Sequence, residues 1–413
     1  MKTLPIQPIR GTHDLFGEQL LKYKKIEKLI NKLAKIYDFN EIVTPIFEST
    51  NLFKKPLGEQ SDVVLKEMYT FNDRNDSSIT LRPEHTTPML RSAISNNFIE
   101  KIPKKFFGIG PVFRRERPQK GRYRQFNQIN FEILGAEDVT SDAELIVLAD
   151  NIIKNLFPNK KIILNINSLG DKNTLKLFKN SLSIFFEKYR NDLTEESQNK
   201  IYTNPLRILD SKNPQDMKIN FNAPKIFNFY SVEANNKFTE VQHLLSSIDL
   251  EYVVDPNLVR GLDYYCHTVF EFKSEELGAQ DTLIGGGRYD GLIKLLGGPD
   301  IPGVGWAGGI ERIAMLMDDL SINEKKVHMI LMNEDFKDYG FKISNKLRKN
   351  NINVFFNYKY NLKKSLSVAN QLNAEYAIII GENEINNNLC TLKYLYKNTQ
   401  QTLSIEEIIK QIV

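Results

Sequence analysis

The sequence predicts an α+β fold, in which an antiparallel β-sheet flanked by helices is followed by a smaller α/β domain. Short β-prone runs separated by polar, glycine-containing loops occupy residues 77–134, a pattern typical of antiparallel strands. Beyond Lys325, strand and helix patterns alternate, which favours a small domain with a largely parallel sheet. A chain of 413 residues has room for two or three such units.

The first elements are a helix and a group of strands. Apolar residues recur at three- and four-residue spacing over residues 20–37, which predicts an amphipathic helix. Residues 41–47 are β-prone but contain Pro45, which cannot donate a ladder hydrogen bond, so we expect an edge or interface strand there. The strands of the sheet are predicted at residues 78–81, 106–113 and 125–134.

The following part of the chain is predicted as an insertion. Residues 171–250 are rich in Lys, Asn and Ser and carry only weak helical periodicity. Strand patterns resume at residues 251–254 and 264–272, and a glycine-rich stretch then leads into a helix near residues 309–320. We therefore place the larger domain, with its insertion, at residues 1–322.

The C-terminal domain is predicted at residues 326–413. It begins with a buried-strand pattern at residues 327–331, followed by a polar helix and a second strand at residues 352–356. A helix near residues 362–371 and a third strand at residues 376–380 complete the alternation, which indicates parallel strands joined by helices.

Composition excludes several classes of protein. The chain is 41% hydrophobic and 26% charged, no apolar run approaches the roughly 20 residues that cross a bilayer, and the N-terminus resembles neither a signal nor a transit peptide. We therefore expect a cytoplasmic protein without membrane contact. A net charge of +4 does not indicate nucleic-acid binding unless charge clusters locally. Cys266 and Cys390 are isolated, and the five histidines lack metal-ligand spacing, so no metal site built from protein side chains is predicted.

A basic loop is predicted between two strands at residues 113–124. Six basic residues crowd it: Arg114, Arg115, Arg117, Lys120, Arg122 and Arg124. Guanidinium groups bind phosphate through paired hydrogen bonds and stay charged at physiological pH, so the loop suits ATP or an RNA backbone. The same residues are compatible with an ordinary solvated hairpin.

The strand that follows carries a two-sided pattern. Alternation places Ile129, Phe131 and Ile133 on one face and the polar side chains Gln128, Asn130 and Glu132 on the other. If helices cover the apolar face, the polar row can form the floor of a pocket for a small polar ligand. An ordinary solvent face has the same pattern.

Three glycine-containing segments hold candidate site residues. In residues 258–265, Arg260 lies beside glycine, a carboxylate and two tyrosines that can orient a ligand. In residues 303–312, Arg312 lies near a predicted helix N-terminus, where free amide groups assist anion binding. Residues 285–291 lack the Lys-Ser/Thr ending of a P-loop and do not match the dinucleotide fingerprint.

Together these segments resemble the motifs of class II aminoacyl-tRNA synthetases, over nearly the whole chain. Residues 113–116 with 122–126 resemble motif 2 and its loop, and residues 303–312 resemble motif 3. Residues 258–265 and 286–291 are similar to the two signatures that distinguish the histidyl-tRNA synthetases within that class.

The resemblance implies a reaction in which the histidine carboxylate attacks the α-phosphate of ATP, pyrophosphate leaves, and histidine is then loaded onto the 3′ end of tRNA(His). It implies that Arg114 and Arg260 are catalytic and flank the α-phosphate, where fixed cations stabilise the transferring group. Arg312 would hold the γ-phosphate, and Mg²⁺ would accompany the pyrophosphate portion. The other implied ATP contacts are Glu116, Arg122 and Phe126.

The resemblance also implies contacts to the other substrates. The histidine-binding residues would be Glu84, Thr86 and Gln128 at the α-ammonium, Glu132 and Tyr265 at the imidazole, and Arg260, Tyr264 and Tyr289 around them. Such a site rejects analogues that leave its buried polar groups unpaired. Gln119 and Arg124 would contact the acceptor end of tRNA, and the C-terminal domain the anticodon. Pro45 is similar to the motif 1 proline, which implies a homodimer.

One position departs from the family pattern. Where the family has a small residue after the glutamate of its Arg-Pro-Glu-Gly-Thr motif, this chain has His85 between Glu84 and Thr86. A side chain of this size can reshape the loop that carries both neighbours.

Three other hypotheses stay open. The first is a catalytically silent paralog that regulates the first step of histidine biosynthesis, which the retained arginines and the complete C-terminal domain disfavour. The second is a class II synthetase for another amino acid, which the two histidine-like signatures disfavour. The third is a general RNA-binding protein, which is supported by little other than the basic loop.

Overall fold

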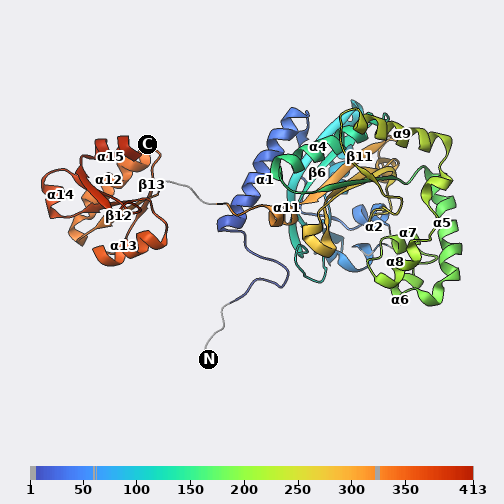
Figure 1. Ribbon diagram of the computed structural model, residues 1–413, viewed down its shortest axis with the longest axis horizontal. Helices are drawn as coiled ribbons and strands as arrows, with labels where there is room; N and C mark the ends of the chain where they lie inside the picture. The colour runs from blue at the N-terminus through green and yellow to red at the C-terminus, as the bar shows by residue number, and fades with distance from the viewer. Residues whose placement is uncertain (1–5, 59–60, 62, 321–325, 413) are drawn as a thin grey trace. The chain divides into compact units, whose positions relative to one another are not determined.

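The computed structural model describes residues 6–58, 61, 63–320 and 326–412 of the chain (Figure 1). The chain divides into two compact units, Met1–Leu320 and Ser321–Val413, and each is described by itself. The predicted end of the larger domain at residue 322 lies outside the described residues. No described helix is both long and apolar enough to cross a membrane.

An eight-stranded sheet forms the centre of the larger unit. Its strands are, in spatial order, β1 (Asn40–Glu41), β5 (Lys104–Phe113), β6 (Gln125–Leu134), β11 (Gly303–Gly309), β10 (Thr282–Arg288), β9 (Cys266–Lys273), β7 (Ile163–Ser168) and β8 (Val253–Val254). Neighbouring strands are antiparallel except for the pairs β1–β5 and β7–β8 at the two edges. The predicted antiparallel sheet is thereby confirmed.

Helices cover one face of this sheet. They are α1 (Gly17–Ile36), α4 (Thr140–Leu156), α9 (Val232–Ser246) and α11 (Ile310–Leu316) (Figure 1). The apolar stripe of α1, including Ile26 and Ile30, packs into one core with Phe131 of β6 and Trp306 of β11. The predicted amphipathic helix thus forms because burying this stripe removes a large apolar area from water.

The opposite face carries α3 (Thr86–Ser95) and helices of the predicted insertion. These are α5 (Lys172–Lys188), α6 (Glu195–Gln198), α7 (Leu206–Leu209) and α8 (Pro214–Asn220), and a second core joins several of them to Tyr265 and Tyr289. A small three-stranded sheet, β2 (Phe47–Ser49), β4 (Ser78–Leu81) and β3 (Tyr69–Asn72), lies beside α2 (Asn51–Leu57). Although α9 lies within residues 171–250, it packs with α4 on the main sheet.

The smaller unit contains a five-stranded sheet. Its spatial order is β13 (Asn353–Phe356), β12 (Lys326–Leu331), β14 (Tyr376–Ile380), β15 (Cys390–Tyr394) and β16 (Thr399–Leu403). The first three strands are parallel and connected through α12 (Lys337–Lys349) and α13 (Leu362–Gln371), as predicted. The last two form an antiparallel hairpin that precedes α15 (Ile405–Ile412), and the sequence pattern did not predict them.

Two local predictions were wrong. Residues 41–47 do not form one strand, because β1 ends at Glu41 and β2 begins at Phe47 in a different sheet. Around Pro45 the Arg82 guanidinium donates to the carbonyl oxygen of Thr44 at 2.8 Å, which takes the place of a strand ladder. The glycine-rich stretch was expected to lead directly into a helix, yet it supplies two central strands, β10 and β11.

Candidate active site

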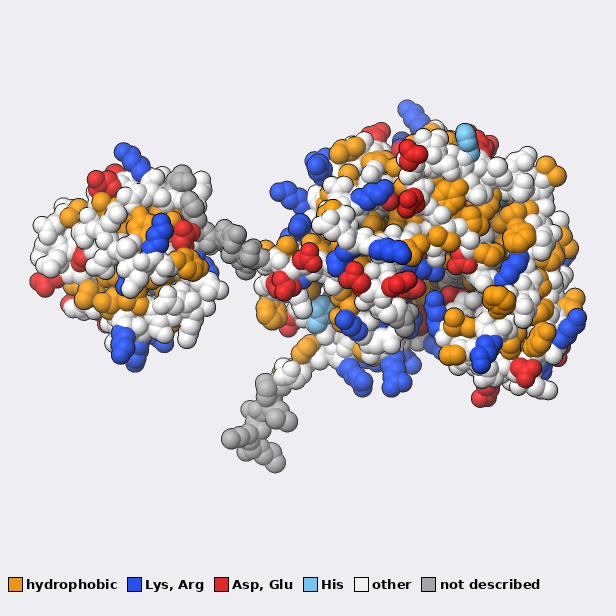
Figure 2. All heavy atoms as spheres, in the orientation of Figure 1, with side chains coloured by type: hydrophobic (Ala, Val, Ile, Leu, Met, Phe, Trp, Pro, Cys, Tyr) orange, Lys and Arg blue, Asp and Glu red, His pale blue; other side chains and the backbone are white. Residues whose placement is uncertain are grey.

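A cavity of about 650 Å³ lies over the polar side of β6 in the larger unit. Figure 2 shows a hollow on one face of this unit, with Lys and Arg side chains near its rim. Most predicted contacts to ATP and histidine line the cavity: Glu84, Thr86, Arg114, Glu116, Arg122, Phe126, Gln128, Arg260, Tyr264, Tyr265 and Arg312. Residues from four distant parts of the chain therefore meet in one place.

The two faces of β6 differ as the alternation predicted. Ile129, Phe131 and Ile133 are at most 1% exposed and belong to the main core. The polar residues on the other face are buried as well, so this face is not an ordinary solvent surface. Gln128 lines the cavity, and its Oε1 accepts a hydrogen bond from the backbone N–H of His85 at 3.2 Å.

Glu132, like Asn130, is almost fully buried and does not itself line the cavity. Thr86 Oγ1 donates to its carboxylate at 2.6 Å, and the hydroxyl of Tyr289 donates at 2.5 Å. Burial raises the pKa of Glu132 to about 8, and nearby Glu84 adds to the effect. Tyr289 likewise lies behind the cavity, 1% exposed, so two predicted histidine contacts form a layer beneath the floor.

Glu84 and His85 point to different places. The Glu84 carboxylate accepts hydrogen bonds from the backbone N–H groups of Thr86 and Thr87, each at 2.8 Å, at the start of α3. His85 does not line the cavity, because its Nε2 lies 3.2 Å from the carbonyl oxygen of Gly110 on β5. Burial lowers the pKa of His85 to about 3, with the Arg82 charge adding to the effect, so the ring is neutral. The unusual side chain thus leaves Glu84 and Thr86 at the cavity.

Three arginines gather at one end of the cavity. Arg114 and Arg122 come from the loop between β5 and β6, and Arg312 comes from α11. Arg114 Nε donates to the Pro83 carbonyl oxygen at 2.9 Å, and its guanidinium lies 5.6 Å from the ring centroid of Phe126. Burial and the charges of Arg114 and Arg122 lower the pKa of Arg312. Like charges held together in this way favour a polyanionic ligand.

A fourth arginine, Arg260, approaches from the loop before β9. It forms an ion pair with Glu271, and its guanidinium lies 5.7 Å from the ring centroid of Tyr265. Burial, the largest single effect, lowers the pKa of Arg260, but the Glu271 carboxylate together with Tyr265, Tyr264 and Asp210 outweighs burial and raises the pKa above its ordinary value. Arg260 is thus a charged group held in a fixed orientation, as electrostatic stabilisation of a transition state requires.

Glycines make room for these side chains, a role that the sequence pattern did not reveal. A Cβ atom at Gly305 would lie 1.6 Å from Glu132 Oε2, and one at Gly285 would lie 2.5 Å from a terminal nitrogen of Arg260. The central strands β10 and β11 can therefore pass beneath the site only without side chains at these positions. The signal was present in the sequence as two clusters of glycine.

The insertion also contributes to the cavity, which we had not predicted. Lys200, Arg207 and Asp210 line it. Arg207 donates to the Gly261 carbonyl oxygen, and Asn204 Nδ2 donates to Asp263 Oδ1 at 3.0 Å. The insertion therefore holds the loop that carries Arg260. The Lys- and Asn-rich composition of this segment and its weak helical periodicity indicate only an insertion.

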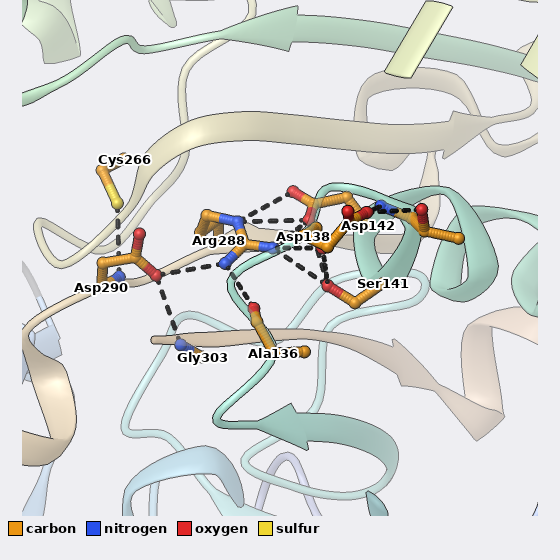
Figure 3. Close-up of polar contacts among 9 residues, drawn as sticks. Ala136, Asp138, Ser141, Asp142, Cys266, Arg288, Asp290 and Gly303 are labelled. Carbon is orange, nitrogen blue, oxygen red and sulfur yellow. Dashed lines mark hydrogen bonds and ion pairs between the residues drawn. The ribbon is translucent and has the colours of Figure 1, made fainter. Parts of the chain in front are cut away.

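Arg288, from the third glycine-containing segment, points away from the cavity. Its guanidinium pairs with Asp142 of α4 and donates to Ser141 Oγ at 3.0 Å and to the Ala136 carbonyl oxygen at 3.0 Å (Figure 3). It is 1% exposed. This buried ion pair ties β10 to α4 and supports the sheet beneath the site.

The two predicted tRNA contacts do not line the cavity. Gln119 is exposed at the tip of the basic loop. Arg124 lies nearer its base, where its Nε donates to the Glu116 carbonyl oxygen at 3.3 Å. Both stay available to a ligand larger than one that fills the cavity.

Comparison with known proteins identifies the family of this chain. The family model for histidyl-tRNA synthetase matches residues 11–313, and the model for an anticodon binding domain matches residues 324–413. The chain is 43% identical to a histidine–tRNA ligase from Wolbachia pipientis wMel over 98% of this chain and 99% of that protein. It is 45% identical to one from Ehrlichia chaffeensis over 96% of each. The apo S. aureus histidyl-tRNA synthetase superposes with a TM-score of 0.80 at 33% identity, over 99% of this chain and all of that one. The chain therefore belongs to the histidyl-tRNA synthetase family.

Proposed function

We propose that this chain is a histidine–tRNA ligase, which converts L-histidine and ATP to histidyl-adenylate and pyrophosphate and then transfers histidine to the 3′ end of tRNA(His). One observation carries the proposal: a single cavity joins a buried polar floor, suited to a small zwitterion, to an end where three arginines meet. Family membership supports the same reaction.

The arginines act on the phosphates of ATP. A carboxylate oxygen of histidine attacks the α-phosphorus in line, the bond from that phosphorus to the bridging oxygen breaks, and pyrophosphate leaves with the electron pair. Arg114 and Arg260 flank the α-phosphate, and Arg312 holds the γ-phosphate. Glu116, Arg122 and Phe126 complete the ATP site. Arg122 is oriented for this by its ion pair with Glu116.

Mg²⁺ accompanies ATP in this proposal. Carboxylates of Glu67, Glu116 and Glu271 line the same cavity, and carboxylate oxygens are ligands that suit Mg²⁺. The ion supplies charge neutralisation to the pyrophosphate portion when it is bound.

Histidine occupies the polar floor. Glu84, Thr86 and Gln128 bind the α-ammonium group, which is reasonable because Oε2 of Glu84, which accepts from the backbone N–H of Thr86, can accept a further hydrogen bond. Glu132 and Tyr265 recognise the imidazole, and Arg260, Tyr264 and Tyr289 enclose it. Glu132 and Tyr289 lie beneath the cavity floor. They can contact the substrate only if the imidazole ring of histidine enters between Thr86 and Tyr265.

The larger domain, residues 1–322, carries these steps, and residues 326–413 bind the anticodon of tRNA. Gln119 and Arg124 contact the acceptor end from outside the cavity. We further propose a cytoplasmic homodimer. Its interface is supported by apolar residues exposed beside the sheet-edge strands β1 and β2: Val43 is 78% exposed, Ile46 43% and Phe47 57%.

The direct test is ATP–pyrophosphate exchange with the purified chain and each of the twenty amino acids in turn, without tRNA. Exchange stimulated by histidine alone is expected. Stimulation by another amino acid would overturn the histidine assignment, and no exchange from folded protein would favour the regulatory paralog.

Arg260→Ala tests the catalytic assignment. We expect a loss of about a hundredfold or more in histidine-dependent exchange, because removing one preorganised charge at the reacting group has this effect. The variant also leaves Glu271 without its partner, so Arg260→Lys, which keeps the charge but not the planar fork, separates catalysis from folding. Arg190→Ala, on the surface of the insertion, is the matched control. Wild-type exchange in Arg260→Ala would refute the role.

A further inference from the structure

A mixed group of metal-ligand side chains lies outside the cavity, at the start of β9. Cys266, His267 and Asp290 each place one potential ligand atom within 4.8 Å of the other two. The sequence had suggested no metal site, because neither cysteine pairs nor regularly spaced histidines are present. Asp290, 24 residues from Cys266, completes this group only in the folded chain.

A β-bulge brings the two neighbouring ligands to the same side. Adjacent residues of a regular strand point to opposite faces. Here Cys266 pairs with Arg288 and Val269 pairs with Gly287, so two extra residues lie on β9 between these pairs. His267, the first of them, has a φ of 44°, in the left-handed region that side chains rarely adopt. Such strained positions concentrate at functional sites.

His267 also has an unused ring nitrogen. The residue is 9% exposed, and its buried Nδ1 makes no hydrogen bond with the described part of the chain. A buried polar atom without a partner costs free energy that a ligand can recover. Cys266 is buried too, while the Asp290 side chain is 33% exposed and gives the group access to solvent.

The surrounding charges permit a cation. Arg288 reaches Asp290 Oδ1 only at 3.4 Å and is paired mainly with Asp142 (Figure 3). Lys237, which faces His267, has its own partner in Glu233 at 2.7 Å. Arg288 and Lys237 therefore each have a carboxylate partner of their own. In Figure 3 the Cys266 sulfur and the Asp290 carboxylate lie next to each other, with the backbone N–H of Asp290 donating to the sulfur.

We propose that Cys266, His267 and Asp290 bind one Zn²⁺ ion, through a thiolate sulfur, an imidazole nitrogen and a carboxylate oxygen. Zinc takes such a set in tetrahedral geometry, leaving the fourth position to water. With bonds of about 2.0–2.3 Å, ligand atoms lie roughly 3.3–3.8 Å apart, so the three groups need only a small approach. Binding displaces the thiol proton of Cys266 to solvent.

The ion would connect two strands directly behind the cavity. Cys266 follows Tyr265, which lines the cavity, and Asp290 follows Tyr289, whose hydroxyl donates to Glu132. Zinc would thus hold the start of β9 to the end of β10 and steady both tyrosines. This inference requires no step of the proposed reaction.

The test uses the full chain, freed of metal by dialysis against a chelator. Equilibrium dialysis with Zn²⁺ should give one ion per chain, and titration with Co²⁺ should produce a thiolate-to-cobalt charge-transfer band. Cys266→Ala and His267→Ala should lose both signals, and Cys390→Ala, which removes the other buried cysteine, should retain them. Asp290→Asn keeps the shape of the side chain and should weaken Zn²⁺ binding at least about tenfold. This variant tests the site even if an alanine variant fails to fold.

Equal zinc retention by the wild type and Cys266→Ala, or a cobalt band that survives in Cys266→Ala, would overturn the site and identify the metal as adventitious. Histidine-dependent exchange is measured on the same metal-free samples with Mg²⁺ restored. Exchange without zinc binding refutes only the zinc site, and zinc binding without exchange refutes only the proposed reaction.

Discussion

The neighbouring strands β6 and β11 meet at the buried Glu132, and β11 pairs along its whole length with residues 128–134 of β6, yet their sequences are informative in opposite ways. The bounds of β6 and the assignment of its two faces follow from alternating side chains. β11 was missed, because four of its seven residues are glycine and leave no alternation to detect. β6 contributes to the site through its polar side chains, whereas β11 contributes through the absence of side chains at its glycines.

The difference shows how the site obtains its space. Gly305 lies opposite Glu132 in the sheet register, and its missing side chain leaves the volume that the Glu132 carboxylate fills. Substitutions that remove the polar groups of β6 and substitutions that add atoms to β11 should therefore disturb one pocket by different routes.

The largest effect is expected from Gly305→Ala. Its Cβ would lie 1.6 Å from Glu132 Oε2 and 2.7 Å from the Phe131 carbonyl oxygen, which belongs to the backbone and cannot easily move. We expect the free energy of unfolding to fall by about 3 kcal/mol, measured by urea denaturation, and histidine-dependent exchange to be lost. Gly309→Ala, whose Cβ would meet its nearest atom at 3.8 Å, should change stability little. Equal stability of the two variants would contradict the proposed role of glycine.

Glu132→Gln is expected to have a smaller effect on the free energy of unfolding of the ligand-free protein, and this effect is an increase. The folded-state pKa of Glu132, about 8, lies above its ordinary 4.5, so the folded state retains a proton that the unfolded state releases. This contribution is complete below pH 4.5 and is lost as the pH rises through 8. Above that pH, Glu132→Gln should be more stable than the wild type by on the order of 2 kcal/mol, while histidine affinity falls.

Urea denaturation below pH 4.5 and above pH 8 measures this difference, with the surface variant Glu187→Gln as the control. A constant difference between wild type and Glu132→Gln across this range would show that Glu132 does not hold the proton.

The smallest effect on the site is expected from His85→Gly. Because His85 lies against β5 and not in the cavity, the KM for histidine in the exchange assay should change less than about twofold. The substitution should instead lower the free energy of unfolding by roughly 2 kcal/mol. Thr86→Val, which removes the donor to Glu132, should raise that KM about tenfold. A similar rise in both variants would mean that His85 shapes the histidine site after all.

Local pattern predicted those parts whose own side chains carry a periodic signal: α1, β6 and the three parallel strands of the smaller unit. It failed where a neighbour decides the structure. Residues 41–47 leave one sheet for another because Arg82, from a distant strand end, binds the backbone there. Likewise, nothing in the insertion sequence indicates that Arg207 reaches Gly261. Motif resemblance, not periodicity, assigned the individual arginines to their proposed roles.

The hydrogen bonds from Arg207 and Asn204 hold the Arg260 loop at Gly261 and Asp263, on either side of Leu262. A displacement of the helical insertion would carry that loop with it, so the position of the insertion and the orientation of the Arg260 guanidinium, which we propose to be catalytic, are mechanically linked. We therefore expect passage of substrates beside the insertion and alignment of this charge to be coupled.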